Sequence, residues 1–212
     1  MIGMNCEMIQ AAWRVAIFLV LLFVTGCSGE EISPGSFTVA GYVRMGGIPA
    51  AGVSVVMDNA GNWTTATDSS GYFRIIGVTP ALRTISLSLT APDGSFTDQK
   101  FSTAVQGDVF LPSLTLPVLI HLRADSLYRG NGIRLVWRQT DAPEFRRYRL
   151  FRRVLLPIDE NSGTPVTDVT TPADTTYADT LVQAGAQYYY RIYVFNELVR
   201  VCGSNTVGMT AR

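Results

Sequence analysis

Side chains that commonly carry catalysis are scarce in this sequence of 212 residues. It contains one histidine, His121, with no second metal-binding side chain at ligand spacing. A serine triad holds its histidine between a nucleophile and a carboxylate, whereas His121 lies in an alternating segment that favours an imidazole at the solvent boundary. The adjacent Asp159 and Glu160 point in opposite directions in an extended chain, which favours a solubilising turn over a calcium site. We therefore expect no enzymatic activity, no metal and no cofactor.

Arginines gather in one segment, Arg146 to Arg153. Alternate residues of a strand share a face, so the segment predicts a solvent-facing basic strip made of Arg147, Arg149, Phe151 and Arg153. Tyr148 and Leu150 would then face the core. The strip could bind an anionic glycan, lipid head groups or an acidic protein. The favoured alternative is that its arginines pair with nearby carboxylates and protect a strand edge from aggregation, and docking against the acidic first half of the chain is a third.

A cysteine stands behind a short apolar run near the N-terminus. Arg14 is followed by ten uncharged residues, 15–24. A membrane-spanning helix needs about twenty apolar residues, and a signal-peptide core needs roughly seven to fifteen. The run therefore predicts a signal peptide, which ends in the sequence Val24-Thr25-Gly26-Cys27. Translation from Met4 or Met8 instead of Met1 is an open alternative, since the stretch before Arg14 is long.

Those four residues resemble the lipobox of bacterial lipoproteins. The resemblance implies that residues 1–26 are removed, that the Cys27 thiol receives a diacylglycerol, and that residues 27–36 form a lipidated tether. Each buried methylene contributes about 0.8 kcal/mol, so two or three acyl chains anchor a protein durably. The residue after the cysteine is Ser28, and not an Asp that would resemble the inner-membrane retention signal of such lipoproteins. The resemblance therefore favours the outer membrane in an organism that has one. The alternative is an ordinary secretory signal with a cysteine near its cleavage site by chance.

Composition limits the fold and the partners. The formal net charge is zero, which argues against nucleic acid as a partner. Residues 28–117 hold four basic and seven acidic side chains, and residues 118–212 hold twelve and nine, an asymmetry that coincides with a domain boundary. Once Cys6 is removed and Cys27 is lipidated, Cys202 has no disulfide partner and is expected as a small buried residue.

The first half after the tether alternates between short runs rich in Val, Ile, Thr and aromatic residues and clusters of turn residues. Five runs are strand candidates: 37–44, 53–57, 63–67, 72–76 and 84–90. Asp68 can cap the turn before the fourth run, and Gly71 can adopt a conformation that other residues resist. That turn would place Phe73 and Ile75 on the core face.

Several pieces of this half share an order with a known family: Gly41-Tyr42-Val43, Gly47-Ile48-Pro49, Ala51-Gly52-Val53-Ser54-Val55 and Thr67-Asp68-Ser69-Ser70-Gly71-Tyr72-Phe73-Arg74-Ile75. They resemble the carboxypeptidase regulatory-like domain. The resemblance implies a non-catalytic, transthyretin-like β-sandwich over residues 37–117.

Residues 118–212 hold further strand candidates, at 133–137, 145–151, 176–179 and 188–195, with a last strand after Asn205. The stretch 159–172 is expected as a loop with one short edge strand at most. Four pieces resemble a fibronectin type III domain: Leu135-x-Trp137, Tyr148 to Arg152, Tyr177-x-Asp179 and Ala184 to Ile192. The resemblance implies a second β-sandwich, in which Tyr188 turns its hydroxyl back to a corner at Gly185.

The sequence thus predicts an all-β protein with two consecutive β-sandwich domains after a lipoprotein signal peptide. The expected function is that of a non-catalytic binding or structural module in the bacterial envelope. Its partners would be the membrane, through the N-terminal lipid, and a protein or a glycan. The alternative is a carbohydrate-binding or other accessory subunit of a separate envelope enzyme or transporter. A hydrolase that uses His121 is the weakest of the three readings.

Overall fold

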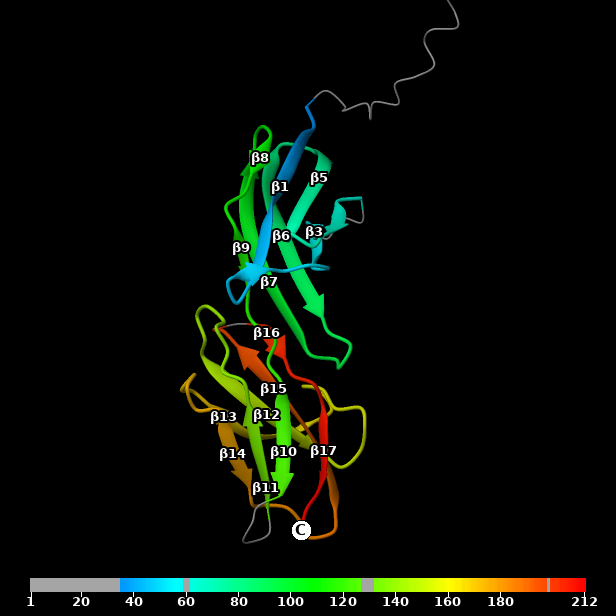
Figure 1. Cartoon of the computed structure of the whole chain (residues 1–212), viewed down its shortest axis with the longest axis vertical. Helices are drawn as coiled ribbons and strands as arrows, with labels where there is room; N and C mark the ends of the chain where they lie inside the picture. The colour runs from blue at the N-terminus through cyan, green and yellow to red at the C-terminus, as the bar shows by residue number, and fades with distance from the viewer. Residues whose placement is uncertain (1–34, 59–61, 127–131, 198) are drawn as a thin grey trace, which may run out of the picture. The chain divides into compact units, whose positions relative to one another are not determined.

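The computed structural model describes residues 35–58, 62–126, 132–197 and 199–212. Every element of regular structure in these ranges is a β-strand (Figure 1). The strands form two consecutive β-sandwiches, so the predicted fold class is confirmed. Among the described residues, no helix has the length and apolar character needed to cross a membrane.

The first sandwich consists of two facing sheets. The strands of one sheet are β1 (Phe37–Met45), β2 (Ile48–Pro49), β5 (Tyr72–Val78), β8 (Val109–Phe110) and β9 (Leu114–Leu116). In that sheet β1 is central, because β2 and β5 pair with it antiparallel and β8 and β9 pair with it parallel. The strands of the other sheet are β3 (Ser54–Met57), β4 (Thr64–Ala66), β6 (Ala81–Thr90) and β7 (Phe96–Val105).

The turn before β5 fixes which residues of this sandwich face its core. Asp68 Oδ1 accepts hydrogen bonds from the backbone nitrogens of Ser70, at 2.8 Å, and Tyr72, at 3.0 Å. Gly71 then takes a φ of +78°, a region that L-residues with a Cβ avoid. The predicted roles of both residues are confirmed, and Phe73 and Ile75 are buried in the core with side chains from both sheets.

The second sandwich also consists of two facing sheets. The strands of its smaller sheet are β10 (Leu122–Ser126), β11 (Ile133–Trp137) and β14 (Thr176–Asp179). The strands of the other sheet are β12 (Arg147–Arg153), β13 (Thr164–Val169), β15 (Gln187–Phe195), β16 (Arg200–Gly203) and β17 (Val207–Thr210). The edge strand expected within 159–172 is β13, which pairs with β12.

Two tyrosines in the core of the second sandwich form hydrogen bonds between their hydroxyl groups and the backbone. The backbone nitrogen of Gln183 donates to Tyr188 Oη at 3.1 Å, and Gly185 between them has a φ of +78°. The predicted corner at Tyr188 is therefore confirmed. Tyr148 is completely buried, where its hydroxyl accepts from Thr140 N at 2.9 Å and donates to the carbonyl of Pro172 at 3.0 Å.

The two sandwiches share a sheet, which the sequence did not predict. Strand β16 of the second sandwich pairs antiparallel with β7 of the first, with Cys202 opposite Thr97 and Gly203 opposite Phe96. This pairing produces a nine-stranded sheet that runs from β13 to β4. Gly203 permits the approach, because a Cβ there would lie 2.2 Å from Cε1 of Phe96.

Candidate functional site

The arginines of the basic strip are paired with carboxylate and carbonyl oxygens. Arg149 donates from Nε and Nη2 to the two oxygens of Asp168, both at 2.7 Å. Asp168 lies opposite it on β13, and these hydrogen bonds hold the pKa of the Asp168 carboxyl below its usual range. Arg147 Nε lies 3.6 Å from the same carboxylate, and Arg153 donates to the carbonyl of Pro157 at 2.5 Å. These contacts support the alternative in which the strip is structural.

Phe151 does not face solvent, so that part of the prediction is wrong. Its side chain is 3% exposed and packs against Ile158 and Tyr193, with the ring of Tyr193 5.6 Å away. Alternation placed Phe151 on the correct face of β12, but the segment between β12 and β13 returns over that face and covers it with Ile158. Ligand binding by the strip stays a prediction, but the exposed part of the strip no longer includes Phe151.

Stacked arginines and aromatic rings cover the same face of the sheet. The guanidinium carbons of Arg147 and Arg149 lie 5.2 and 5.9 Å from the centre of the Phe195 ring. Two further arginines stack in the same way on Tyr193 and Phe96: Arg191 and Arg200. Such contacts contribute about 0.5–1 kcal/mol each at exposed sites. Arg149, Arg191 and Arg200 also form hydrogen bonds at their edges. Nε of Arg147, by contrast, is buried without a hydrogen-bond partner among the described residues.

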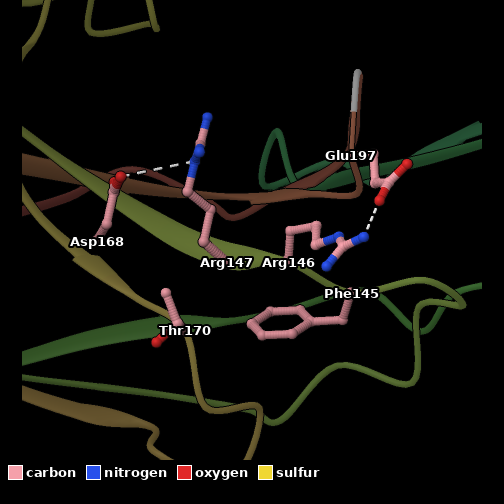
Figure 2. A pocket seen from close by; sticks show the side chains of 6 residues that line it. All are labelled: Phe145, Arg146, Arg147, Asp168, Thr170 and Glu197. Carbon is pink, nitrogen blue, oxygen red and sulfur yellow. Dashed lines mark ion pairs between the residues drawn. The ribbon is translucent and has the colours of Figure 1, made fainter.

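A cavity of about 730 Å³ opens at one end of the strip, lined by Phe145, Arg146, Arg147, Asp168, Thr170 and Glu197. Figure 2 shows Arg146 turned toward Glu197 and Arg147 turned toward Asp168. Both guanidiniums thus have a carboxylate partner within the cavity itself. An anionic ligand would have to compete with those carboxylates.

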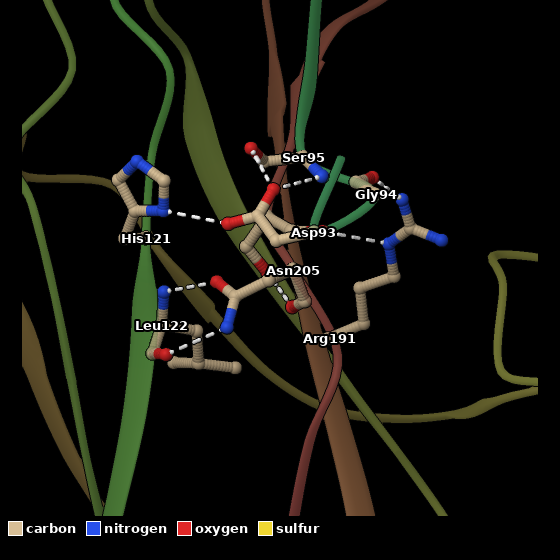
Figure 3. A network of polar contacts seen from close by, with 8 residues as sticks. Asp93, Gly94, Ser95, His121, Leu122, Arg191 and Asn205 are labelled. Atoms are coloured by element: carbon tan, nitrogen blue, oxygen red, sulfur yellow. Dashed lines mark hydrogen bonds and ion pairs between the residues drawn. The ribbon is translucent and has the colours of Figure 1, made fainter. Parts of the chain in front are cut away.

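A polar network reinforces the junction of the two sandwiches (Figure 3). His121 Nδ1 lies 3.0 Å from Asp93 Oδ2, and its side chain is 53% exposed, which confirms the expected boundary imidazole. Arg191 donates from Nη2 to the carbonyl of Gly94 at 2.7 Å. Hydrogen bonds from the side chain and backbone of Ser95 lower the pKa of Asp93, which keeps that carboxylate charged beside the imidazole.

A second cavity, of about 470 Å³, lies where β7 and β16 diverge beyond their paired residues. It is lined by Asp98, Gln99, Lys100, Glu144, Asn196, Val199, Arg200 and Val201. Within the described part of the chain, Oδ1 of Asp98, Oε1 of Gln99 and Nε of Arg200 are buried without a hydrogen-bond partner. Loss of solvent raises the pKa of the Asp98 carboxyl.

The remaining candidates for chemistry have structural roles. Cys202 is completely buried, and burial raises the pKa of its thiol to about 12, so it is no nucleophile at neutral pH. Asp159 accepts from the backbone nitrogens of Asn161 and Ser162, whereas Glu160 pairs with Arg200 at 2.9 Å. Across the described ranges, no three His, Cys, Asp or Glu side chains gather as a metal site requires. Cys27 lies outside the described residues.

An exposed aromatic cluster on the first sandwich is the feature that the sequence interpretation missed. It consists of Tyr42 on β1, Tyr72 on β5 and Phe110 on β8. Alternation could have found two of its members, because Tyr42 and Tyr72 immediately precede the core residues Val43 and Phe73 and so point outward. Phe110 lies on a strand of two residues, which is too short for alternation to reveal.

The sequence matches no protein-family model and no curated protein. Several solved structures resemble the fold. A DUF3823 family protein from Bacteroides ovatus is 12% identical, with 82% of this chain and 98% of that one covered and a TM-score of 0.35. The major pilin subunit BcpA of Bacillus cereus is 13% identical, with 82% and 69% covered and a TM-score of 0.44.

A segment of two fibronectin type III domains from chicken tenascin is 16% identical, with 74% of this chain and 80% of that segment covered and a TM-score of 0.31. Likenesses at these identities and scores say nothing about ligand or activity. The chain is thus similar to several proteins built from β-sandwiches.

Proposed function

We propose that this protein is a non-catalytic lipoprotein of the bacterial envelope, anchored through a lipid on Cys27, that acts as a binding or structural module. The observation that carries the proposal is the junction of the sandwiches. Strand pairing between β7 and β16, the Arg191–Gly94 hydrogen bond and the His121–Asp93 contact connect them directly. Two sandwiches joined in this way suit presentation of a surface at a distance from a tether.

The anchor is tested by Cys27→Ser in cells that are fed an alkyne analogue of palmitate. We expect the wild-type protein to carry the label and to sediment with membranes, and the variant to lose both properties. Cys202→Ser is the matched control and should keep both, because its thiol is buried and would not be lipidated. A Cys27→Ser protein that still sediments fully with membranes would refute the anchor.

A second candidate function is that of a carbohydrate-binding accessory subunit for a separate envelope enzyme or transporter. The exposed aromatic cluster favours it, because exposed apolar patches often mark binding sites. An independent hydrolase is the competing reading. It would be supported by turnover of ester, peptide or glycoside substrates that disappears in His121→Ala, and we expect no such turnover.

A further inference from the structure

The aromatic cluster lies on the outer face of the sheet formed by β5, β1 and β8, which are adjacent in Figure 1. Strand register places the three aromatic residues, together with Ala40 and Arg74, in two neighbouring rows across the strands. Tyr42 on β1 stands opposite Tyr72 on β5. Two residues earlier on β1, Ala40 stands between Arg74 on β5 and Phe110 on β8. Since alternate residues share a face, all five lie on the face opposite the core residues Val43 and Phe73, where Ala40 is itself buried.

The aromatic side chains form one exposed patch. The ring of Tyr42 lies 5.4 Å from that of Tyr72 and 5.9 Å from that of Phe110, so the three rings make one contiguous apolar surface. Phe110 is 66% exposed and Tyr42 is 40% exposed. Ala40, between Arg74 and Phe110 in the register, is buried at 7% exposure.

Arg74 gives the aromatic patch a polar side. It is exposed, and within the described part of the chain it forms no ion pair. This distinguishes it from Arg147 and Arg149 of the basic strip, which share the carboxylate of Asp168. The guanidinium of Arg74 is thus available to donate hydrogen bonds to oxygen atoms of a ligand that rests on the rings.

The aromatic patch is too small for a stable protein interface. Fully buried aromatic side chains cover about 150–250 Å² each, and the members of this cluster are only partly exposed. A standard protein interface buries roughly 800 Å² on each partner. A sugar ring needs less area, because it presents an apolar C–H face to an aromatic ring while its hydroxyl groups extend around the rim.

We infer that Tyr42, Tyr72, Phe110 and Arg74 form a saccharide-binding platform. The rings stack on the C–H face of a sugar, and Arg74 donates to its hydroxyl or carboxylate oxygens. This inference rests on the proposed role as an envelope binding module and names the ligand class and the residues. It assigns binding to the first sandwich, and not to the basic strip of the second.

The test uses the full chain solubilised in mild detergent and biolayer interferometry over immobilised polysaccharides. The probes are xylan, galactomannan and mixed-linkage β-glucan as neutral polymers, polygalacturonate and hyaluronan as acidic ones, and peptidoglycan glycan strands. We expect at least one probe to bind. Tyr42→Ala should weaken that binding about tenfold, since its ring contacts both others, and Tyr42→Phe should leave it within about twofold.

Further variants separate a saccharide from other occupants. Phe110→Leu keeps an apolar side chain but removes the flat ring, so it should weaken sugar stacking and leave a purely apolar protein contact intact. Arg74→Ala should weaken binding several-fold, and a larger loss on the acidic probes than on the neutral ones would identify a carboxylate sugar. Leu82→Ala is the matched control, because Leu82 is 76% exposed outside the cluster and should have no effect.

Three results would overturn the inference: no probe binds, binding survives Tyr42→Ala combined with Phe110→Ala, or Arg74→Ala changes nothing. The membrane anchor is scored separately by Cys27→Ser. Loss of the anchor with retained polysaccharide binding would refute only the proposed tether. An intact anchor with no polysaccharide binding would refute the platform and leave a structural lipoprotein.

Discussion

At Gly71 the backbone enters β5 with a φ of +78°, and a Cβ there would lie 2.4 Å from the carbonyl oxygen of Val43. Gly71→Ala therefore combines a strained backbone with a clash against β1. We expect the free energy of unfolding in urea to fall by roughly 3 kcal/mol. Gly52→Ala is the control: its φ is +70° but nothing lies within 4 Å, so about 1 kcal/mol of backbone strain is expected. Equal losses at both positions would contradict the clash.

The ionised carboxylate of Asp98 destabilises the folded state at neutral pH. Its pKa is raised, chiefly by burial, so the folded state binds its proton more tightly than the unfolded state. The protonated carboxyl of Asp98 therefore stabilises the fold. This contribution is complete below the unfolded pKa of about 3.9 and is lost as pH rises through the raised folded pKa. Asp98→Asn should therefore raise the melting temperature at pH 7, with a smaller difference near pH 4.

Asp168→Asn provides the matched comparison for Asp98. Hydrogen bonds from Arg149 lower the pKa of Asp168, so its stabilisation is present above the unfolded pKa and is lost as pH falls through the folded one. That variant should lower the melting temperature at pH 7. If both variants shift the melting temperature in the same direction at pH 7, the opposite signs assigned to these carboxyls are wrong.

Strand β12 carries two neighbouring arginines with different surroundings. Arg152 donates from Nη1 to Oδ2 of the completely buried Asp179 at 2.8 Å. Tyr190 also donates to this oxygen, at 2.9 Å. Arg152→Ala leaves a buried carboxylate without its cation and should cost about 3 kcal/mol in urea unfolding. Arg153→Ala removes a hydrogen bond to a backbone carbonyl and should cost about 1 kcal/mol or less. A cost for Arg152→Ala as small as that for Arg153→Ala would contradict this account.

Sequence reasoning found the strands whose core-facing residues are apolar, such as β5 with Phe73 and Ile75 and β11 with Ile133, Leu135 and Trp137. It missed β7, because the core side of that strand includes Thr97, Gln99 and Thr103 and the contrast in hydropathy is weak. Pairing of β7 with β16 depends on two segments that are far apart in the sequence. Local alternation cannot report such a contact, nor the return of Ile158 over Phe151.

The hydrogen-bonded junction predicts that the two sandwiches of the molecule unfold together. Differential scanning calorimetry of the wild-type chain should show one transition. Gly203→Ala would place a Cβ 2.2 Å from Cε1 of Phe96 and 2.9 Å from Cδ1 of Tyr193, so it should separate β16 from β7 and produce two transitions.

Gly107→Ala is the control for the junction, since nothing lies within 4 Å of its added Cβ and its φ is not positive. It should retain the single transition. Two transitions in the wild-type chain would mean that the junction does not couple the sandwiches.

The central place of β1 has a mechanical consequence. A pull on the chain at Phe37 acts along β1, which is bonded on one side to β5 and on the other to β8 and β9. A force directed along a strand loads its ladder hydrogen bonds in shear, so that many must break together, whereas a force across the strand opens them one at a time. If the protein is held by a lipid at Cys27, the first strand after the tether is the one best placed to bear tension.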